Sequence, residues 1–470
     1  MNIHYIYKTN LAIMKKIFLF VSLISFHFVI SQVTLTSFNP NIAHTHFGSA
    51  LDTFGNEIVA TASNTTFMTQ SNVFVFEKTA SGIVQETYFT PSDGVQSDYF
   101  GTSVAINNDF IAVGSPYHNQ VATFAGAIYL YRKVSGNWQF FQKIVAFDGI
   151  ADDRFGTSVK LHNNQLFVSS LNNEPIGQPT TANNGAVYVY NFNGTNWVFS
   201  QKITVAGSSQ FGRKIKIENN TMVILSSSLN NLQTYMFDGS NWNFLNNLIV
   251  SLADFDLDNN QLFVLDSNTN SMIIYENVSN SWTTSTTLTS LNFGGLMPTN
   301  FELKDNILLV TLGFHALLYT SPTPVSYYRK ISGNWIFQQF LNGNGNPSQD
   351  DYFGSRIAIT NDLVVIGANN ENYGLPTGKV YFVETALGID ENAINEIALY
   401  PNPTTGNVFL SQNTINEIDS VEIYQLDGKL ISIKNQFLDA ISLSEFQNGI
   451  YLLKFNRING SSFTKKIVKI

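Results

Sequence analysis

The sequence of 470 residues contains no cysteine, and only 13% of its residues are charged. The lack of cysteine excludes disulfide bonds, thiol catalysis and metal sites with cysteine ligands. Stability must therefore come from packing and from hydrogen bonds between strands. The formal net charge is −9 and the pI is near 5.3. This acidic balance argues against nucleic acid or an anionic membrane surface as a partner.

Motifs of known catalytic chemistry are missing as well. The sequence has no Gly–x–Ser–x–Gly, no His–Glu–x–x–His, no phosphate-binding loop and no dinucleotide-binding fingerprint. Paired carboxylates such as Asp152–Asp153 and Asp350–Asp351 lie in polar stretches, where solvated acids are the usual case. We therefore expect no catalytic residues, no metal ligands and no cofactor.

One marked apolar run lies near the N-terminus, over residues 17–30, directly after two lysines that follow Met14. A basic start, a hydrophobic stretch and a small residue predict a secretory signal peptide over residues 1–31, with cleavage near Ser31 and Gln32. We expect Met14 to be the true start. The run is short for a spanning helix, so we expect no transmembrane anchor in the mature chain. A retained anchor is the alternative.

Aromatic residues, in contrast, are plentiful at 13% and recur at fixed spacing. Five times a tyrosine is followed seven residues later by a tryptophan, and a polar turn, usually Gly–x–Asn, precedes the tryptophan. Aromatics that repeat with the period of a fold are expected to pack between sheets rather than to bind sugars. These pairs include all five tryptophans of the chain: Tyr131/Trp138, Tyr190/Trp197, Tyr235/Trp242, Tyr275/Trp282 and Tyr328/Trp335.

A second marker, Phe–Gly, recurs upstream of these pairs. The steps between its phenylalanines are 53, 55, 56 and 142 residues, and degenerate copies around Phe255 and Phe301 divide the last step into 44, 46 and 52. Seven copies at a period of about 50 residues indicate a propeller or a solenoid. The marker phenylalanines are Phe47, Phe100, Phe155, Phe211 and Phe353.

Each copy reads as four strands. In the third copy, the alternating runs TSVKLH and QLFVSS are separated by Asn163–Asn164, and GAVYVYN and WVFSQKI are separated by FNGTN. The pattern predicts a seven-bladed β-propeller over residues 32–386. Residues 33–38 form a spare strand, whereas the seventh copy lacks its fourth strand. We therefore expect the N-terminal strand to complete the seventh blade.

The repeat markers stop after the propeller. We expect a linker over residues 387–396 and a small C-terminal β-sandwich over residues 397–470, which makes the whole chain all-β. The alternating runs in this part are divided by Asp427–Gly428 and Asn448–Gly449, which are hairpin signals.

The repeats resemble those of the FG-GAP propellers, a family that includes the integrin alpha-subunit head. The resemblance is carried by the Phe–Gly starts and by Gly126–Ala127 and Gly185–Ala186. Many members of this family bind calcium at an Asp–x–Asp–x–Asp–Gly loop, so calcium is a possible cofactor by resemblance. That loop is absent here. The nearest string, Asp254 to Asp258, falls within an expected strand.

The C-terminal part is similar to the sorting domain of the type IX secretion system of Bacteroidota. The resemblance implies export across the outer membrane with the type IX secretion machinery as a partner, and a location that is secreted or on the outer-membrane surface. The residues that carry it are Tyr400, Pro401, Asn402, Pro403, Asp427, Gly428, Lys429, Gly449, Ile450, Tyr451, Lys465 and Lys466.

These observations favour a binding or adhesion protein with an extracellular protein or glycan as its ligand. A polysaccharide-acting enzyme, with acids at the central channel, and a structural or gliding-associated surface component are the alternatives. We expect binding on the side of the disc that carries the long loops, with a cationic partner or a weakly bound cation. The candidate residues are Tyr117, Tyr373, Asp93, Asp98, Asp148, Asp152, Asp153, Asp350 and Asp351.

Overall fold

The structure is a computed structural model, and it contains 35 strands and a single 3-10 helix, Gln96–Asp98, within the residues that it describes. These residues are 35–38, 46–62, 71–79, 82–173, 184–207, 209–226, 231–250, 252–266, 268–269, 271–288, 291, 297–313, 324–331, 333–343, 352–360, 363–369, 378–384, 399–400, 402–410, 418–425, 429–434, 440–457 and 462–470.

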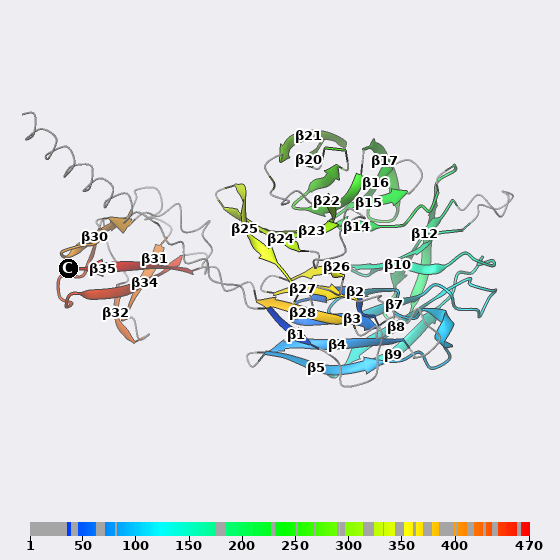
Figure 1. Ribbon diagram of the computed structural model, residues 1–470, viewed down its shortest axis with the longest axis horizontal. Helices are drawn as coiled ribbons and strands as arrows, with labels where there is room; N and C mark the ends of the chain where they lie inside the picture. The colour runs from blue at the N-terminus through cyan, green and yellow to red at the C-terminus, as the bar shows by residue number, and fades with distance from the viewer. Residues whose placement is uncertain are drawn as a thin grey trace, which may run out of the picture. The chain divides into compact units, whose positions relative to one another are not determined.

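Seven four-stranded antiparallel sheets follow one another along the chain and form the seven blades (Figure 1). The first strands of the seven sheets line one central cavity, so they are the innermost strands. From the innermost to the outermost strand, the blades are: blade 1, β2 (Phe47–Phe54), β3 (Glu57–Ala62), β4 (Asn72–Thr79) and β5 (Gly82–Phe89); blade 2, β6 (Ser103–Ile106), β7 (Phe110–Ser115), β8 (Ala127–Val134) and β9 (Asn137–Ile144); blade 3, β10 (Phe155–His162), β11 (Gln165–Ser170), β12 (Ala186–Phe192) and β13 (Trp197–Thr204); blade 4, β14 (Ile215–Glu218), β15 (Thr221–Ser226), β16 (Asn231–Phe237) and β17 (Trp242–Ile249); blade 5, β18 (Leu252–Asp258), β19 (Gln261–Asp266), β20 (Ser271–Val278) and β21 (Ser281–Leu288); blade 6, β22 (Met297–Lys304), β23 (Ile307–Gly313), β24 (Val325–Ile331) and β25 (Asn334–Leu341); blade 7, β26 (Phe353–Ile359), β27 (Leu363–Ala368), β28 (Lys379–Glu384) and β1 (Leu35–Phe38).

The propeller is closed by its N-terminal strand. The strand β1 pairs antiparallel with β28, from Leu35 opposite Val383 to Phe38 opposite Val380. Figure 1 shows the two strands side by side. The expected closure is therefore confirmed, and it covers the edge of β28 that would otherwise be free to pair with another chain.

The recurrent tryptophans pack between blades, as predicted. In blades 2 to 6 the tyrosine of each pair lies on the third strand and the tryptophan on the fourth. The ring of Trp197 meets that of Phe110 in the preceding blade at 5.1 Å, edge to face, and Trp242 meets Phe167 at 5.6 Å in the same way. These repeated contacts serve the fold, since each joins one blade to the next.

A glutamine four residues after the tryptophan adds a polar clasp between outer strands. The side chain of Gln142 accepts a hydrogen bond from the backbone N–H of Trp197 at 2.9 Å and donates one to its carbonyl at 3.1 Å. Gln201 makes the same two bonds to Trp242, both at 2.9 Å. The clasp pairs backbone groups of an edge strand that have no strand beside them.

The glycines of the Phe–Gly and Gly–Ala markers lie where neighbouring blades touch. Gly156 has a φ of 98°, and a Cβ there would lie 2.7 Å from the carbonyl oxygen of Ala127 in blade 2. A Cβ on Gly126 would lie 2.1 Å from the carbonyl oxygen of Phe155. Only glycine accommodates both the backbone conformation and this approach, which explains why the two markers recur together.

The two phenylalanines taken as degenerate Phe–Gly markers, Phe255 and Phe301, lie in the first strands of blades 5 and 6, but four residues later in the strand than the marker phenylalanine. Phe255 lies in β18 opposite Val264, three residues before the last pair of the hairpin. The residue at that position in blade 3 is Val159 of β10, not Phe155. Phe301 is likewise within β22, opposite Val310. Both phenylalanines are buried core residues, so neither of them is the counterpart of the Phe–Gly start.

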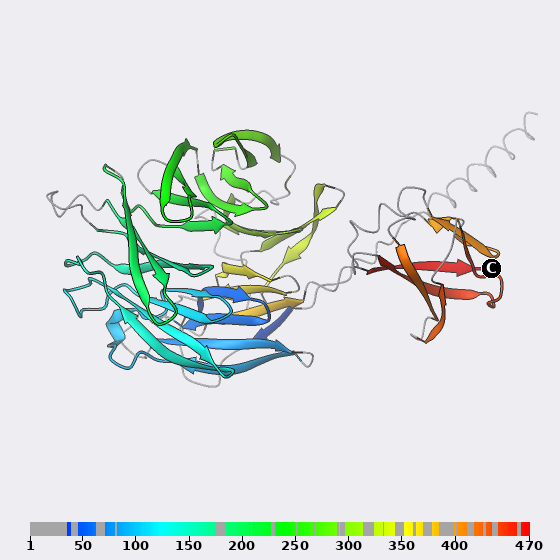
Figure 2. The same cartoon turned by 180° about the vertical axis from the view of Figure 1, so that it is seen from behind.

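The C-terminal part consists of two sheets (Figure 2). One sheet has the order β29 (Leu399–Tyr400), β30 (Asn407–Leu410) and β33 (Ala440–Ser442). The other has the order β32 (Leu430–Lys434), β31 (Ile418–Gln425), β34 (Gly449–Arg457) and β35 (Ser462–Lys469). Val408 and Ile441 of the first sheet share one core with Val421, Leu453 and Phe455 of the second. This arrangement is the β-sandwich that the sequence predicts.

One hairpin prediction in the sandwich is wrong. Asn448–Gly449 does not join two paired strands, because β33 pairs with β30 and β34 pairs with β31 and β35. The glycine marks the point where the chain crosses from one sheet to the other. The expected hairpin at Asp427–Gly428 joins β31 and β32, which pair, although these two residues lie outside the described part of the chain.

The predicted signal peptide over residues 1–31, with Met14, Ser31 and Gln32, and the linker over residues 387–396 also lie outside the described residues. In the part of the chain that the structure describes, no helix has the length and apolar character needed to cross a membrane.

Candidate functional site: the long-loop face and the central channel

The connections between blades and the loops between second and third strands gather on one side of the propeller. In blade 2, the backbone N–H of Tyr117 donates to the carbonyl of Asp98 in the preceding connection at 3.3 Å. On the other side of the same loop, the N–H of Asp152 donates to the carbonyl of Thr123 at 2.8 Å. We call this surface the long-loop face. It is the side on which the sequence predicts ligand binding.

The short turns gather on the opposite side. The side chain of Asn219 donates to Asn260 of the next blade at 3.2 Å. A hollow of about 540 Å³ between blades 3 and 4 is lined by residues of these turns and by His162, Phe237 and Trp242. The two sides therefore differ as the sequence predicts, with short polar turns opposite long loops.

Two of the candidate acids anchor the connections between blades. The carboxylate of Asp93 accepts hydrogen bonds from the hydroxyl of Tyr129 at 2.8 Å and from the ammonium of Lys143 at 2.7 Å. Burial alone would raise the pKa of Asp93, but the bonds from Lys143 and Tyr129 outweigh it and lower the pKa.

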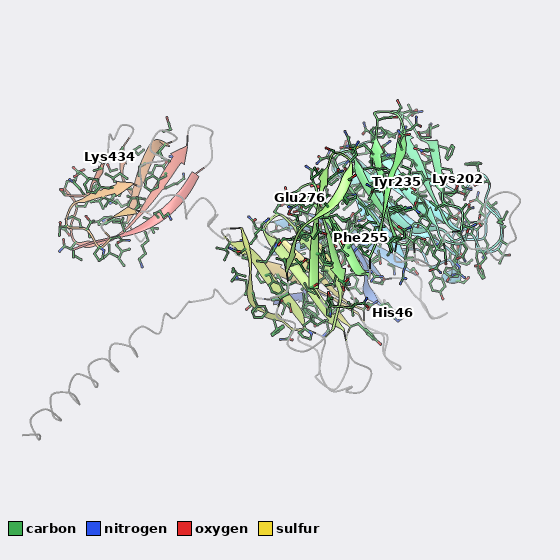
Figure 3. All side chains as sticks on the ribbon, turned by 90° about the horizontal axis from the view of Figure 1, so that it is seen from above. His46, Lys202, Tyr235, Phe255, Glu276 and Lys434 are labelled. Atoms are coloured by element: carbon green, nitrogen blue, oxygen red, sulfur yellow. The ribbon has the colours of Figure 1, made fainter. Side chains whose placement is uncertain are left out.

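The next connection repeats this arrangement with Asp148. Its carboxylate accepts bonds from the hydroxyl of Tyr188 at 2.7 Å and from the ammonium of Lys202 at 2.6 Å. Lys202 is labelled on the propeller in Figure 3. Asp93 and Asp148 are therefore each paired with a lysine of the following blade, which cancels most of their negative charge.

Two further candidate acids, Asp98 and Asp153, are buried, with only 1% of each exposed. Asp98 accepts the backbone N–H of Val95 at 3.1 Å, and Asp153 accepts that of Ile150 at 3.0 Å. Burial raises the pKa of Asp153, although the bonds from Ile150 and Asn173 oppose the shift. Their local role is to hold the connections in one conformation.

A histidine that the sequence analysis did not single out takes part in the first of these anchors. His118 is buried, and its Nδ1 lies 2.6 Å from Asp98. Because the ammonium of Lys143 contacts Nε2 and has only protons to donate, Nε2 accepts and Nδ1 donates to the carboxylate. Asn173 occupies the same place in blade 3 and donates to Asp153 at 3.0 Å. His118 could have been identified by aligning the loop of blade 2 with that of blade 3, because His118 and Asn173 are each 20 residues after the aspartate that they contact.

Tyr117 lies in an aromatic cluster rather than standing free. Its ring packs against Tyr99 at 4.6 Å and Phe124 at 5.3 Å, and the guanidinium of Arg154 lies 5.2 Å from its centre. Arg154 also pairs with Asp152 at 2.9 Å. Tyr117 is half-buried and Asp152 is exposed, so the structure brings these two candidates together at the seam between blades 2 and 3.

Large apolar side chains are exposed along the same loops. Phe147 is 66% exposed and Val95 is 60% exposed, and Ile150 and Val121 are also exposed. A backbone that is fixed by internal bonds thus presents apolar groups to solvent. The remaining candidates, Tyr373, Asp350 and Asp351, lie outside the described residues.

The second candidate site is the central channel, a cavity of about 650 Å³ that is lined by the innermost strands of all seven blades. One side of its wall carries small residues, such as Ala50, Ser103 and Ser158. A cluster of charged side chains comes from β14 and the residue before it, Lys214, and from β18 and β22. Sequence analysis missed this cluster. The signal was the alternation of charged residues within those three strands.

The charged residues of the channel form a compact network. Lys214 pairs with Asp254 at 2.7 Å, and Lys216 lies 2.7 Å from both Asp256 and Glu302. Burial would raise the pKa of Glu302, but the nearby lysines lower it. For Asp256 burial outweighs Lys216 and raises the pKa to about 6. The ammonium group of Lys216 lies between the two carboxylates, which share its positive charge.

The two aspartates also cap the edge of the next blade. Asp254 accepts the backbone N–H of Phe301 at 3.0 Å, and Asp256 accepts that of Leu303 at 3.1 Å. The string Asp254 to Asp258 is therefore a strand whose carboxylates serve its neighbours, as the alternation suggests. Among the described residues, no group of three or more histidine, aspartate or glutamate side chains is arranged to hold a metal ion.

The sorting motif residues lie against the last strand of the sandwich. The side chain of Asn402 donates to the carbonyl of Lys466 at 3.1 Å and accepts the N–H of Val468 at 2.9 Å. The hydroxyl of Tyr451 donates to the carbonyl of Gln447 at 2.7 Å. Gly449 and Ile450 begin β34, Lys465 lies in β35, Pro403 and Lys429 are described in loops, and Pro401 lies outside the described residues.

Comparison with known proteins finds two families along the chain. The FG-GAP repeat matches residues 83–131, 138–190 and 344–383, and the secretion system C-terminal sorting domain matches residues 398–470. None of the curated proteins compared with the chain matches it. Among solved structures, the β-propeller domain of Cps50 (Swd1) from Myceliophteria thermophila is 8% identical with a TM-score of 0.48, and the match covers 75% of this chain and 100% of that one.

The first two repeat matches begin in the outermost strand of one blade and end in the third strand of the next. They therefore span the seams where the marker glycines and the buried aspartates lie. The chain is an all-β protein whose seven-bladed β-propeller contains FG-GAP repeats and whose C-terminal type IX sorting domain indicates export to the cell surface or secretion.

Proposed function

We propose that the exported protein is an extracellular recognition protein that binds a protein or a glycan through its long-loop face. The proposed surface comprises the loop 115–126 of blade 2 and the connection 145–154, together with Tyr373, Asp350 and Asp351. One observation carries the proposal. The loop 115–126 is tied to the buried carboxylate of Asp98 through His118, and the connection 145–154 is held by that of Asp153, while large apolar side chains remain exposed.

Such a surface loses little conformational freedom when a partner binds, because the loops are already ordered. Exposed apolar groups rimmed by polar residues are typical of interaction sites. Phe147 offers a large exposed ring, and the cluster of Tyr117, Phe124 and Arg154 offers a second amphipathic area in the same loops. Aromatic and arginine side chains of this kind dominate the binding energy of many interfaces.

The solvent-accessible candidate acids in the described part of this surface are paired with bases. Asp93 and Asp148 are each paired with lysine, and Asp152 is paired with Arg154. Preference for a cationic partner therefore rests on Asp350 and Asp351. We expect binding to weaken as salt rises, but to retain an apolar contribution that salt does not screen.

A non-enzymatic role is the better interpretation of the channel acids. Asp254, Asp256 and Glu302 are already bound to lysine, and the two aspartates also accept backbone N–H groups. Acids engaged in this way are poor candidates for proton transfer to a substrate. A polysaccharide-acting enzyme would need acids that are free to face the substrate.

The proposal is tested by screening the purified protein against arrays of glycans and matrix proteins, beside a panel of chromogenic glycosides. The combined variant Tyr117→Ala, Phe147→Ser and Asp152→Asn should abolish the binding found. The control variant Asn164→Ser and Asn220→Ser changes exposed residues of the short turns and should bind normally. Loss of binding in the control alone, or turnover of a glycoside without stable binding, would reject the proposal. No ligand at all would favour a structural surface component.

A further inference from the structure

The central channel holds an excess of positive charge within an acidic protein. Six basic and three acidic side chains line the cavity in its described part, and Asp256 lies behind the wall. The difference is two positive charges, since six bases face four acids. The basic residues that line it are Lys160, Arg213, Lys214, Lys216, Lys304 and Arg356.

Among the residues that the structure describes, two of these lysines have no acid within ion-pair distance. Lys214 and Lys216 are bound by the acids of β18 and β22, whereas the structure records neither an ion pair nor a hydrogen bond for the ammonium groups of Lys160 and Lys304 within the described residues. Lys214 and Lys216 hold Asp254, Asp256 and Glu302, although Lys160 is near enough to Glu302 to help lower its pKa. Asp52 also lines the cavity, and its carboxylate accepts the backbone N–H of Ile106. An anion in the cavity would supply the directly bound negative charge that Lys160 and Lys304 lack.

The rest of the wall can bind a hydroxylated molecule. Threonine and serine hydroxyl groups from several blades line the cavity, among them Thr102, Thr157 and Ser158. Asn300 also lines it, and its buried amide oxygen has no hydrogen-bond partner in the described structure. It could accept a bond from a ligand hydroxyl group. A volume of about 650 Å³ is within the usual range for small-molecule sites.

We propose that the central channel binds a small oxyanion, a carboxylate or sulfate, carried by a hydroxylated molecule such as an acidic sugar. Lys160 and Lys304 bind the oxyanion, and Asn300 accepts from a hydroxyl group. The small residues Ala50 and Ser103 also line the cavity and leave the space that the ligand fills. This site is distinct from the long-loop face, so each of the two proposals can fail without the other.

The test is calorimetric titration of the purified protein with glucuronate, inorganic sulfate and glucose. Glucuronate should bind saturably and more weakly at high salt, while glucose, which lacks the charge, should not bind. Binding of glucuronate alone would assign a site for an acidic sugar, and binding of sulfate as well would assign an oxyanion site of broader range. Absence of saturable binding by both anions, or equal binding of glucose, would overturn the proposal.

The matched variants locate the site. Lys160→Gln combined with Lys304→Gln should weaken glucuronate binding at least tenfold, because two charge-assisted contacts are lost. Lys330→Gln removes one positive charge from β24, the third strand of blade 6, which does not line the cavity in the described structure. This variant should leave binding unchanged. The three loop-face substitutions should leave it unchanged as well. Unaltered binding in the channel variant would place the anion elsewhere and overturn the proposal.

A second measurement does not depend on the folding of a variant. Lysine acetylation of the native protein, read by mass spectrometry, should be slowed at Lys160 and Lys304 by saturating glucuronate. Lys330 and Lys434 should react at the same rate with and without the ligand. Protection that is absent from both channel lysines, although glucuronate binds, would contradict the assignment.

Discussion

Replacing Lys216 by methionine should destabilise the propeller strongly. The lysine ammonium lies 2.7 Å from both Asp256 and Glu302, whose side chains are 2% and 27% exposed. Removing the cation leaves two neighbouring carboxylates with no lysine between them, and breaking a buried pair in this way costs about 3–5 kcal/mol. Because Glu302 is partly exposed, we expect a loss of about 3 kcal/mol in the free energy of unfolding at pH 7.

The assay is urea unfolding followed by tryptophan fluorescence. All five tryptophans lie in propeller blades, so the signal reports this body and not the sandwich. Lys304→Met is the matched control, because it removes a lysine of the same cavity that has no acid partner, and it should cost less than about 1 kcal/mol. The triple variant Lys216→Met, Asp256→Asn and Glu302→Gln should recover most of the loss. A loss below about 1 kcal/mol for Lys216→Met, or no recovery in the triple variant, would refute the reasoning.

Three other predictions follow from the fold. Burial raises the pKa of Asp258 to about 6, so the stability that this side chain contributes is present below pH 4 and is lost as the pH rises to about 6. The variant Asp258→Asn should therefore be more stable than the native protein at pH 7.5, by about 1 kcal/mol after allowance for partial exposure, and equally stable at pH 3.5. Thermal unfolding measured against pH checks this. Equal stability at both pH values would contradict this. Deleting Leu35–Phe38 should expose the edge of β28 and cause aggregation in size-exclusion chromatography, and an unchanged monomer would argue against closure by β1. Deleting residues 390–470 should retain the propeller in the periplasm, and normal amounts outside the cell after fractionation would contradict the sorting role.

The architecture could be predicted because its markers are local. Phe–Gly and Tyr–x6–Trp each lie within one blade, and their spacing counts the blades without knowledge of the three-dimensional structure. Blades 5 and 6 were counted correctly although Phe255 and Phe301 are not at the marker position, because the first turns of those blades, Asn259–Asn260 and Asp305–Asn306, and their hairpins persist. The closing strand could be predicted because residues 33–38 form a spare strand at the N-terminal end of the repeats, whereas the seventh copy lacks its fourth strand.

The roles of the acids could not be predicted in the same way, because their partners come from other blades. Asp93 bonds to Tyr129 and Lys143, which lie 36 and 50 residues further along the chain. The sequence places Asp93 in a polar connection but does not show that a lysine of the next blade reaches it. The channel network has the same origin, since Lys216 of blade 4 meets Glu302 of blade 6, 86 residues further along the chain.

The recognition role is tested most directly by a footprint of the bound state. Hydrogen–deuterium exchange should be measured on the purified protein, free and saturated with the ligand that the arrays identify. The account predicts slowed exchange in residues 115–126 and 145–154, with no change at Asn163–Asn164 and Asn219–Asn220. Protection confined to these turns, with the two long loops exchanging as in the free protein, would contradict it.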